Sequence, residues 1–309
     1  MQPIHVSLIE NFRAVFYSPF YAAIVLGAYD GEGLEVDLQK SPDPEKTLQQ
    51  LSSGSGQVSW GGPLRILLAH DKDAKSEAVA FCEVARRDPF LLLGRTPNPG
   101  YRPQHLLGKK VAIVSEVPTP WICLQQDLRL AGVDPAQITL APARSMDENA
   151  AALRAGEVDV IQSFHPYAQA VIDSGEGHLW CAAASRGLTS YTTLNTTRGF
   201  IERNPDTILR MTRAMYRTLK WVAAHDGADL ARAVASYFPD VPLPLLSACC
   251  AHYKALEVWS HEPVQTREGF ERLRDSMQAS GVIGRQIAHE ECADMRFAQQ
   301  AAQQGVPSL

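Results

Sequence analysis

The first third of the chain switches between two hydrophobic periods. The segments 5–10 (HVSLIE), 34–40 (LEVDLQK) and 77–85 (EAVAFCEVA) have the alternation or the short apolar run of β-strands. Between them, apolar residues follow Ser18-Pro19 and Pro63 as in helices, and proline is tolerated in the first turn of a helix. This β-α-β order predicts a parallel sheet with right-handed crossovers.

A second unit of the same kind follows residue 88. The strand-like segments FLLLGR, KKVAIVS, QITLAPA and VDVIQSF are separated by loops and helical segments, and Ser145 with Glu148 predicts a capping box at one helix start. After residue 190, the polar strand SYTTLNTT precedes segments that are almost all helical. The longest of these predicts a buried stripe at three- and four-residue spacing, made of Ile208, Met211, Met215, Leu219 and Val222.

These patterns together predict an α/β fold of two lobes. Residues 1–88 and 188–309 would form a discontinuous lobe I that the C-terminal helices complete, and residues 89–187 would form lobe II. The chain would cross between the lobes near residues 83–90 and again near residues 186–191. A cleft between two such lobes is a common place for a small ligand.

Composition narrows the class of partner. The chain has 309 residues and a formal net charge of -5, which argues against nucleic acid, because a phosphate backbone calls for a basic surface. The six cysteines show no CxxC spacing, so we expect free, mostly buried thiols. We also expect no metal ion, no cofactor and no catalytic residue, because the usual nucleotide, zinc and nucleophile motifs are absent.

The sequence leaves two locations open. No run of about 20 apolar residues would cross a bilayer, and residues 1–10 have neither the basic nor the apolar region of a secretory signal. We therefore expect a periplasmic protein whose signal peptide has been removed, or a cytoplasmic protein if Met1 is the native start. We expect a monomer.

Several segments in the same order resemble one known family. The stretches SPFYAAIVLGAYDGEGLEVDL, LLGKKVAIV, LRAGEVDVIQSFHPYAQAVI and TTRGFIERNPDTILRMTRAMYRTLKWVAAH are similar to periplasmic-type substrate-binding proteins of the sulfonate, nitrate and thiamine-pyrimidine group. The resemblance implies the type II binding-protein fold, with the ligand held between the lobes and delivered to an ABC permease in the membrane. The implied ligand is a pyrimidine-like heterocycle, an aromatic acid or a sulfonate.

A general rule for parallel sheets selects the ligand loops without the family. Ligands lie beyond the carboxyl ends of strands, close to helix starts, and four loops meet that condition. Their aromatic rings could wall a flat ligand, and their helix starts could take an anionic group. With the return crossing, the predicted ligand residues are Asn11, Phe12, Tyr17, Pro19, Tyr21, Trp60, Gly61, Gly62, Val117, Pro118, Thr119, Trp121, Phe164, His165, Tyr167 and Tyr191.

Structural roles compete with ligand contact at several of these positions. Trp60 beside two glycines could be a core residue against a tight turn, and His165 could be a structural histidine. We expect Arg65 to be a surface residue rather than an anion clamp, and Glu116 to be a solvated or capping carboxylate.

Two other functions stay open from the sequence. The same fold hosts a pyrimidine-forming thiamine enzyme, desulfinases and decarboxylases, and it could also serve as a ligand sensor. The pyrimidine synthase would need a lysine and a histidine after the third strand and adjacent cysteines near the return crossing. Here those places read WGGPLR and SRGLTSYTTLNTT, so that enzyme's residues cannot be carried over.

Overall fold

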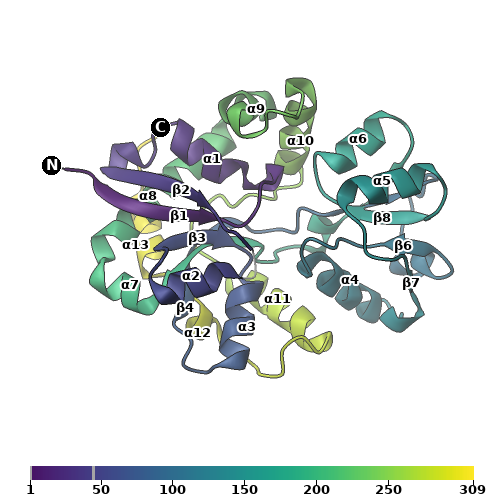
Figure 1. Ribbon diagram of the computed structural model, residues 1–309, viewed down its shortest axis with the longest axis horizontal. Coiled ribbons are helices and arrows are strands. Elements are labelled where there is room, and N and C mark those ends of the chain that lie inside the picture. Colours follow the sequence, from purple (N-terminus) through teal and green to yellow (C-terminus); the bar gives the residue numbers. More distant parts are fainter. Residues whose placement is uncertain (1, 44–45) are drawn as a thin grey trace.

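The strands of the chain form two separate sheets with helices around each of them (Figure 1). The computed structural model describes residues 2–43 and 46–309. Within these residues, the first sheet has the strand order β2-β1-β3-β10-β4 and the second has the order β7-β6-β8-β5-β9. The α/β fold of two lobes that the sequence predicts is therefore confirmed.

The first sheet and its helices make up the left-hand lobe in Figure 1. Its strands are β1 (Ile4–Glu10), β2 (Leu34–Lys40), β3 (Val58–Gly61), β4 (Ala78–Ala85) and β10 (Thr192–Thr197). The helices that follow these strands are α1 (Ser18–Val25), α2 (Thr47–Ser53), α3 (Leu64–Lys72), α7 (Arg198–Arg203), α8 (Pro205–Ala224), α9 (Gly227–Val234), α10 (Leu243–Ala255), α11 (Arg267–Ala279), α12 (His289–Cys292) and α13 (Arg296–Gln304).

The second sheet lies in the right-hand lobe. Its strands are β5 (Leu91–Gly94), β6 (Lys110–Ala112), β7 (Thr139–Leu140), β8 (Val160–Ser163) and β9 (His178–Ala182), and its helices are α4 (Thr119–Leu130), α5 (Met146–Arg154) and α6 (Tyr167–Asp173). Short 3₁₀ turns complete the chain: η1 (Val15–Tyr17), η2 (Asp30–Glu32), η4 (Pro103–Leu106), η5 (Pro135–Gln137), η6 (Ala183–Arg186) and η7 (Ala235–Tyr237).

Each sheet contains one antiparallel strand, and this corrects the purely parallel sheet expected from the β-α-β order. β10 pairs antiparallel with both β3 and β4, and β5 pairs antiparallel with both β8 and β9. The reason is that these are the strands next to the crossings, where the chain enters a lobe from the other one. The connections between the sheets are residues 86–90 and 183–191, and the exact division into 1–88, 89–187 and 188–309 stays a prediction.

The apolar stripe on α8 lies in the core of lobe I, as the helical spacing predicts. Ile208, Met211 and Met215 are fully buried, and Leu219 and Val222 are nearly so. The capping box at the start of α5 is also present, with the Ser145 hydroxyl accepting from the Glu148 amide. The six cysteines are free, and all except Cys181 are buried.

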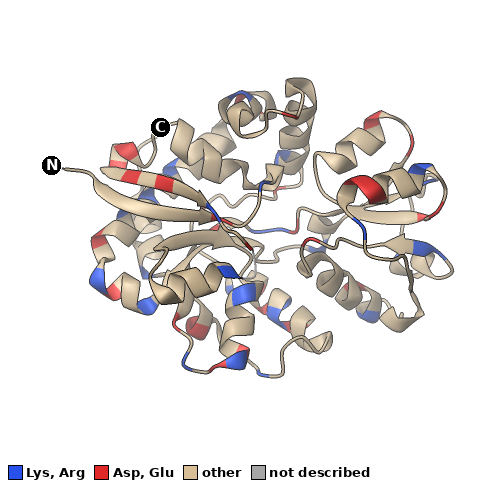
Figure 2. Cartoon of the chain, viewed as in Figure 1, with Lys and Arg blue, Asp and Glu red and all other residues tan. Residues whose placement is uncertain are grey.

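Lys and Arg residues and Asp and Glu residues occur along the elements of both lobes (Figure 2). None of the helices in the described residues has the length and apolar character needed to cross a bilayer. The same residues bring together no group of three or more His, Cys, Asp or Glu that could hold a metal ion.

Candidate functional site

One small cavity receives residues from both lobes, and we call it the interlobe cavity. Its volume is about 30 Å³, and it opens where the loops after β1, β3 and β6 meet the return crossing. These are the strand ends at which the sequence predicts ligand contact. The lining residues are Asn11, Phe12, Phe16, Tyr17, Gly62, Leu64, Arg65, Val117, Pro118, Thr119 and Tyr191.

Aromatic rings from lobe I form one wall of this cavity. The η1 turn directly after β1 folds the chain back, so that Phe12 lies 5.3 Å from Tyr17 and 6.1 Å from Phe16 between ring centroids. Phe16 is in turn 6.3 Å from Tyr191 at the return crossing, with the rings nearly perpendicular. Edge-to-face pairs of this kind hold the rings in fixed orientations and leave a rigid apolar surface.

The polar groups of the cavity are held by local contacts. The Asn11 amide oxygen accepts a hydrogen bond from the Thr47 hydroxyl at 2.7 Å. Burial raises the pKa of Tyr17, and this shift is opposed by the positive charge of Arg65 and by a hydrogen bond with Asn11. The phenol therefore stays neutral, and Arg65 brings a positive charge to the wall of the cavity.

Gly61 explains how Asn11 can come so close to β3. A Cβ atom at this glycine would lie only 2.2 Å from the Asn11 amide nitrogen, well inside contact distance. Gly61 itself does not line the cavity, but its missing side chain makes room for a residue that does.

Eight of the sixteen predicted ligand residues line the interlobe cavity. Asn11, Phe12, Tyr17 and Gly62 come from lobe I, Val117, Pro118 and Thr119 come from lobe II, and Tyr191 comes from the crossing. Their contact with a ligand stays a prediction.

Four predicted residues of lobe I lie in or beside its core instead. Trp60 is fully buried because α1 covers its face of β3: the ring stacks on Phe20 at 4.7 Å and meets Tyr21 edge-to-face. Tyr21 is fully buried and stacks on Tyr237 at 4.5 Å. Pro19 is buried in the first turn of α1, and Gly61 is buried behind Asn11.

Three aromatic residues of lobe II that were predicted to contact the ligand do not line the cavity. Trp121 packs against the apolar cluster between α4 and the second sheet. Phe164 continues the aromatic wall, with its ring centroid 6.5 Å from Phe12 and 5.6 Å from Tyr167. The rings of Phe164 and Tyr167 therefore extend the aromatic wall beyond the residues that line the cavity itself.

His165 makes a contact between the lobes. Its Nε2 lies 2.9 Å from Nδ1 of His252 on α10, and its backbone amide donates to the Tyr253 hydroxyl at 2.9 Å. Burial lowers the pKa of His165 to about 3, and the neighbouring His252 adds to the shift. A neutral histidine in this place closes the α10 side of the joint between the lobes.

Sequence reasoning missed three lining residues: Phe16, Leu64 and Arg65. Arg65, expected to be a surface residue rather than an anion clamp, is partly exposed and lies in the wall of the cavity, and its role toward an anion stays a prediction. Its position two residues after Pro63, at the start of a helix that follows a strand, was the signal for it. The Glu116 carboxylate accepts from Ser115 and from the amide of Met146 at 3.2 Å, which agrees with a capping role.

Comparison with known proteins now places the chain. Residues 16–228 match the sequence profile of the family described as NMT1/THI5 like, and this is more than half of the chain. The chain belongs to the NMT1/THI5-like family.

A curated relative supports the same placement. This NMT1/THI5-like protein is 24% identical over 296 residues to a Bacillus subtilis (strain 168) protein named "Putative binding protein YtlA", and the match covers 95% of this chain and 89% of the relative.

Solved structures share the fold of this NMT1/THI5-like protein. The periplasmic aliphatic sulphonate binding protein SsuA from Escherichia coli has a TM-score of 0.74 at 16% identity, with 94% of this chain and 97% of that chain covered. The desulfurization enzyme DSZB has a TM-score of 0.70 at 14% identity, with 97% and 99% covered. The type II binding-protein fold and the family relation expected from the sequence are confirmed.

Proposed function

We propose that this protein is the solute-binding component of an ABC importer and captures a small organic anion between its lobes. The observation that carries the proposal is the shared lining of the interlobe cavity. Asn11, Tyr17 and Arg65 come from lobe I, while Val117, Pro118 and Thr119 come from lobe II. A solute that contacts both sets of residues favours the closed arrangement of the lobes over the open one.

The size of the cavity supports a closing mechanism. A volume of about 30 Å³ is about the share of liquid volume that one water molecule occupies. An organic solute can therefore enter only when the lobes move apart about the two crossings. Closure then seals the solute against the aromatic wall, and the closed form is the one that a permease would receive.

The lining residues favour an aromatic acid or a sulfonate over a neutral pyrimidine. Phe12, Phe16 and Tyr17 offer flat apolar contact, and Arg65 offers a cationic partner for a carboxylate or sulfonate group. The Asn11 amide and the Thr119 hydroxyl would complete the hydrogen bonds of that group. The structural similarity to the aliphatic sulphonate binding protein SsuA of Escherichia coli supports the same ligand class.

The remaining parts of the proposal follow from the importer role. The partner is an ABC permease, the protein acts as a monomer, and it works in the periplasm, as the periplasmic SsuA of Escherichia coli does.

A binding role is supported by the kind of groups at the cavity. Its described lining residues are apolar, amide, hydroxyl or guanidinium groups, and none is a Cys, His, Asp or Glu that would act as nucleophile or general base. Turnover on the fold of DSZB is the competing function. Incubation of the bound compound with the protein separates the two, because a binder returns it unchanged and an enzyme consumes it.

Calorimetric titration with benzenesulfonate, and with benzamide as its neutral analogue, tests the ligand class. We expect benzenesulfonate to bind and the R65Q variant to lose at least about tenfold in affinity, which corresponds to about 1.4 kcal/mol. The matched control is R232Q, since Arg232 is an exposed arginine on α9 that pairs with nearby Asp229. Equal affinity in R65Q and wild type would overturn the anionic ligand class.

A further inference from the structure

A larger cavity lies on the α4 side of the second sheet, outside the interlobe cavity. It has a volume of about 420 Å³ and is bounded by α4, by η4 and the loop before it, by β5, β8 and β9, and by η6. We call it the α4 pocket. We propose that the α4 pocket is a second binding site, for a neutral aromatic molecule that carries an O–H or N–H donor.

The floor of the α4 pocket is a row of side chains set by strand register. Leu92 on β5 is paired with Gln162 on β8 and, on the other side, with Cys181 on β9. Residues paired across neighbouring strands point to the same face of a sheet, so these three side chains lie next to one another. The row places one amide and one thiol in an otherwise apolar surface.

The amide of this row has an unused acceptor. Gln162 is only 2% exposed, and its Nε2 donates to the backbone oxygen of Pro120 at 2.9 Å. Its Oε1 has no hydrogen-bond partner within the described residues, and the same holds for the buried hydroxyl of Tyr101 across the pocket. Buried polar atoms are nearly always paired in folded proteins, so two unpaired ones that line the same cavity point to a ligand with a donor.

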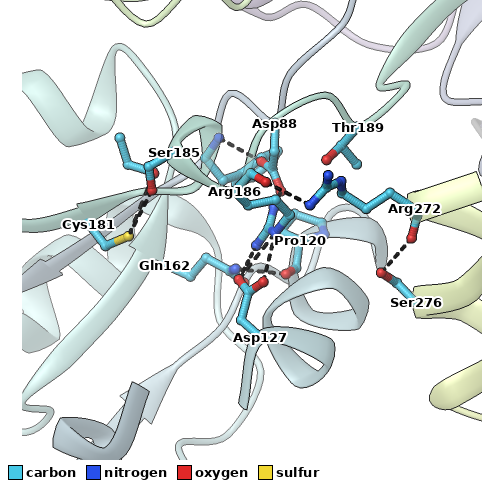
Figure 3. A network of polar contacts seen from close by, with 12 residues as sticks. Asp88, Pro120, Asp127, Gln162, Cys181, Ser185, Arg186, Thr189, Arg272 and Ser276 are labelled. Atoms are coloured by element: carbon cyan, nitrogen blue, oxygen red, sulfur yellow. Dashed lines mark hydrogen bonds and ion pairs between the residues drawn. The ribbon is translucent and has the colours of Figure 1, made fainter. Parts of the chain in front are cut away.

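The charges at one end of the α4 pocket argue against an anion. The Arg186 guanidinium donates to the Asp88 carboxylate at 2.6 Å and to the Asp127 carboxylate at 3.0 Å (Figure 3). Asp127 and Arg186 line this end of the pocket, and the fully buried Asp88 lies behind them, so two carboxylates there face one guanidinium. An anionic ligand would meet an excess of negative charge there, whereas a neutral donor would not.

The remaining walls fit a flat ring. Phe90, Leu124 and Leu130 supply apolar surface, and Leu130 at the rim is 77% exposed although it is a leucine. A concave, mainly apolar cavity of this volume with a few convergent polar groups is typical of small-molecule sites.

The α4 pocket does not depend on closure of the lobes. All of its lining residues lie between residues 90 and 186, in the second lobe and its crossings, and none of them lines the interlobe cavity. The two sites therefore share no lining residue and can be tested separately.

Cys181 allows the proposal to be tested at the site itself. It is the one cysteine of the six that is only partly buried, and it lies in the floor of the pocket. Reaction of the native protein with a thiol reagent such as DTNB should therefore report on Cys181, with C181A as the control for background labelling. We expect 2-naphthol to slow this reaction at least threefold, and 2-naphthoate, which has the same rings and an anionic group, to leave its rate unchanged.

Two variants decide whether the binding has the proposed basis. Q162L removes the acceptor and should weaken 2-naphthol binding about tenfold in a calorimetric titration. If Q162L does not fold, L130S serves instead, because its rim position is exposed; it should weaken binding about threefold, while L140S, an exposed leucine of the same lobe outside the pocket, should not.

Three results would overturn the proposal: no protection of Cys181 by 2-naphthol, equal protection by 2-naphthoate, or full 2-naphthol affinity in Q162L. Because benzenesulfonate reports on the cleft and Cys181 reports on the α4 pocket, failure at one site is distinguishable from failure at the other.

Discussion

The interlobe cavity and the α4 pocket are built in opposite ways. The cavity needs both lobes, has an arginine in its wall and measures about 30 Å³; the pocket belongs to one lobe and its crossings, has an excess of carboxylates and measures about 420 Å³. Under the proposed function, the difference teaches that volume alone does not locate the site of transport, because a cleft that closes on its solute would leave little empty space.

Loss of Arg186 should have the largest effect on the free energy of unfolding and should disrupt the ion pairs at the end of the α4 pocket. R186A leaves Asp88 and Asp127 without their shared partner, and removing one member of a buried ion pair costs about 3–5 kcal/mol. Urea unfolding measures this loss. The control is R232A, which removes a largely exposed pair and should cost less than about 1 kcal/mol. Equal losses in the two variants would contradict the importance of burial here.

Low pH should destabilise the contact between His165 and His252, which joins the lobes beside the interlobe cavity. Burial lowers the folded-state pKa of His165 to about 3, so below pH 6.5 the unfolded chain binds a proton that the folded protein does not. The stability that a neutral His165 contributes is present above pH 6.5 and falls by up to about 1.4 kcal/mol for each pH unit towards 3. Urea midpoints at pH 7.5 and 5.5 should show the loss in wild type and a smaller one in H165N.

Glu83 acts in the opposite direction and must be separated from this effect. Burial raises its pKa to about 8, so its contribution to stability is present below pH 4.5 and is lost as the pH rises towards 8. Wild type and H165N share Glu83, so the difference between their pH profiles isolates His165. H165N should leave the affinity of the α4 pocket for 2-naphthol unchanged. If H165N lowered the affinity for benzenesulfonate and for 2-naphthol equally, the two sites would not be independent.

A single methyl group added at Gly61 should affect the interlobe cavity and not the α4 pocket. G61A places a Cβ against the Asn11 amide and forces it to move, at a cost of about 1–3 kcal/mol in stability. We expect weaker benzenesulfonate binding and unchanged 2-naphthol binding. The control is G284A, because a Cβ at Gly284 would meet nothing within 4 Å. Unchanged benzenesulfonate affinity in a destabilised G61A would remove Asn11 from the ligand site.

The smallest effect is expected at Glu116. E116Q weakens the hydrogen bonds that tie the loop of Val117 and Pro118 to the start of α5, and surface contacts of this kind are worth about 0.5–1 kcal/mol. Thermal unfolding should show this small loss, and benzenesulfonate affinity should fall less than in G61A. A larger fall than in G61A would mean that the carboxylate itself contacts the solute.

Local patterns in the sequence predict most elements but not their neighbours in space. The polar, β-branched segment 190–197 predicts a strand, yet nothing local says that this strand enters between β3 and β4 and runs against them. Nor does the sequence show that η1 and α1 cover Trp60, a candidate for the ligand wall whose ring packs against Phe20 and Tyr21. The strand-end rule finds seven of the lining residues, because it depends only on the order of strands and helices, and the return crossing adds Tyr191.

The groups that sequence reasoning could not find depend on contacts between distant parts of the chain. His165 and His252 are 87 residues apart, and Arg186 is 98 residues from Asp88. Neither pair has a motif, since each partner sits in an ordinary local setting. Arg65 was within reach of the strand-end rule, but its position on a helix made a solvated surface role equally reasonable.

The inserted strand β10 also sets the order in which the two sheets can fold during synthesis. On the ribosome, residues 91–182, which hold the whole second sheet, emerge as one uninterrupted segment and can fold at once. The first sheet must wait with a gap between β3 and β4 until residues 192–197 have been synthesised. During that interval the exposed edges of β3 and β4 are open to wrong partners, so the newborn N-terminal segment is the part most in need of a chaperone.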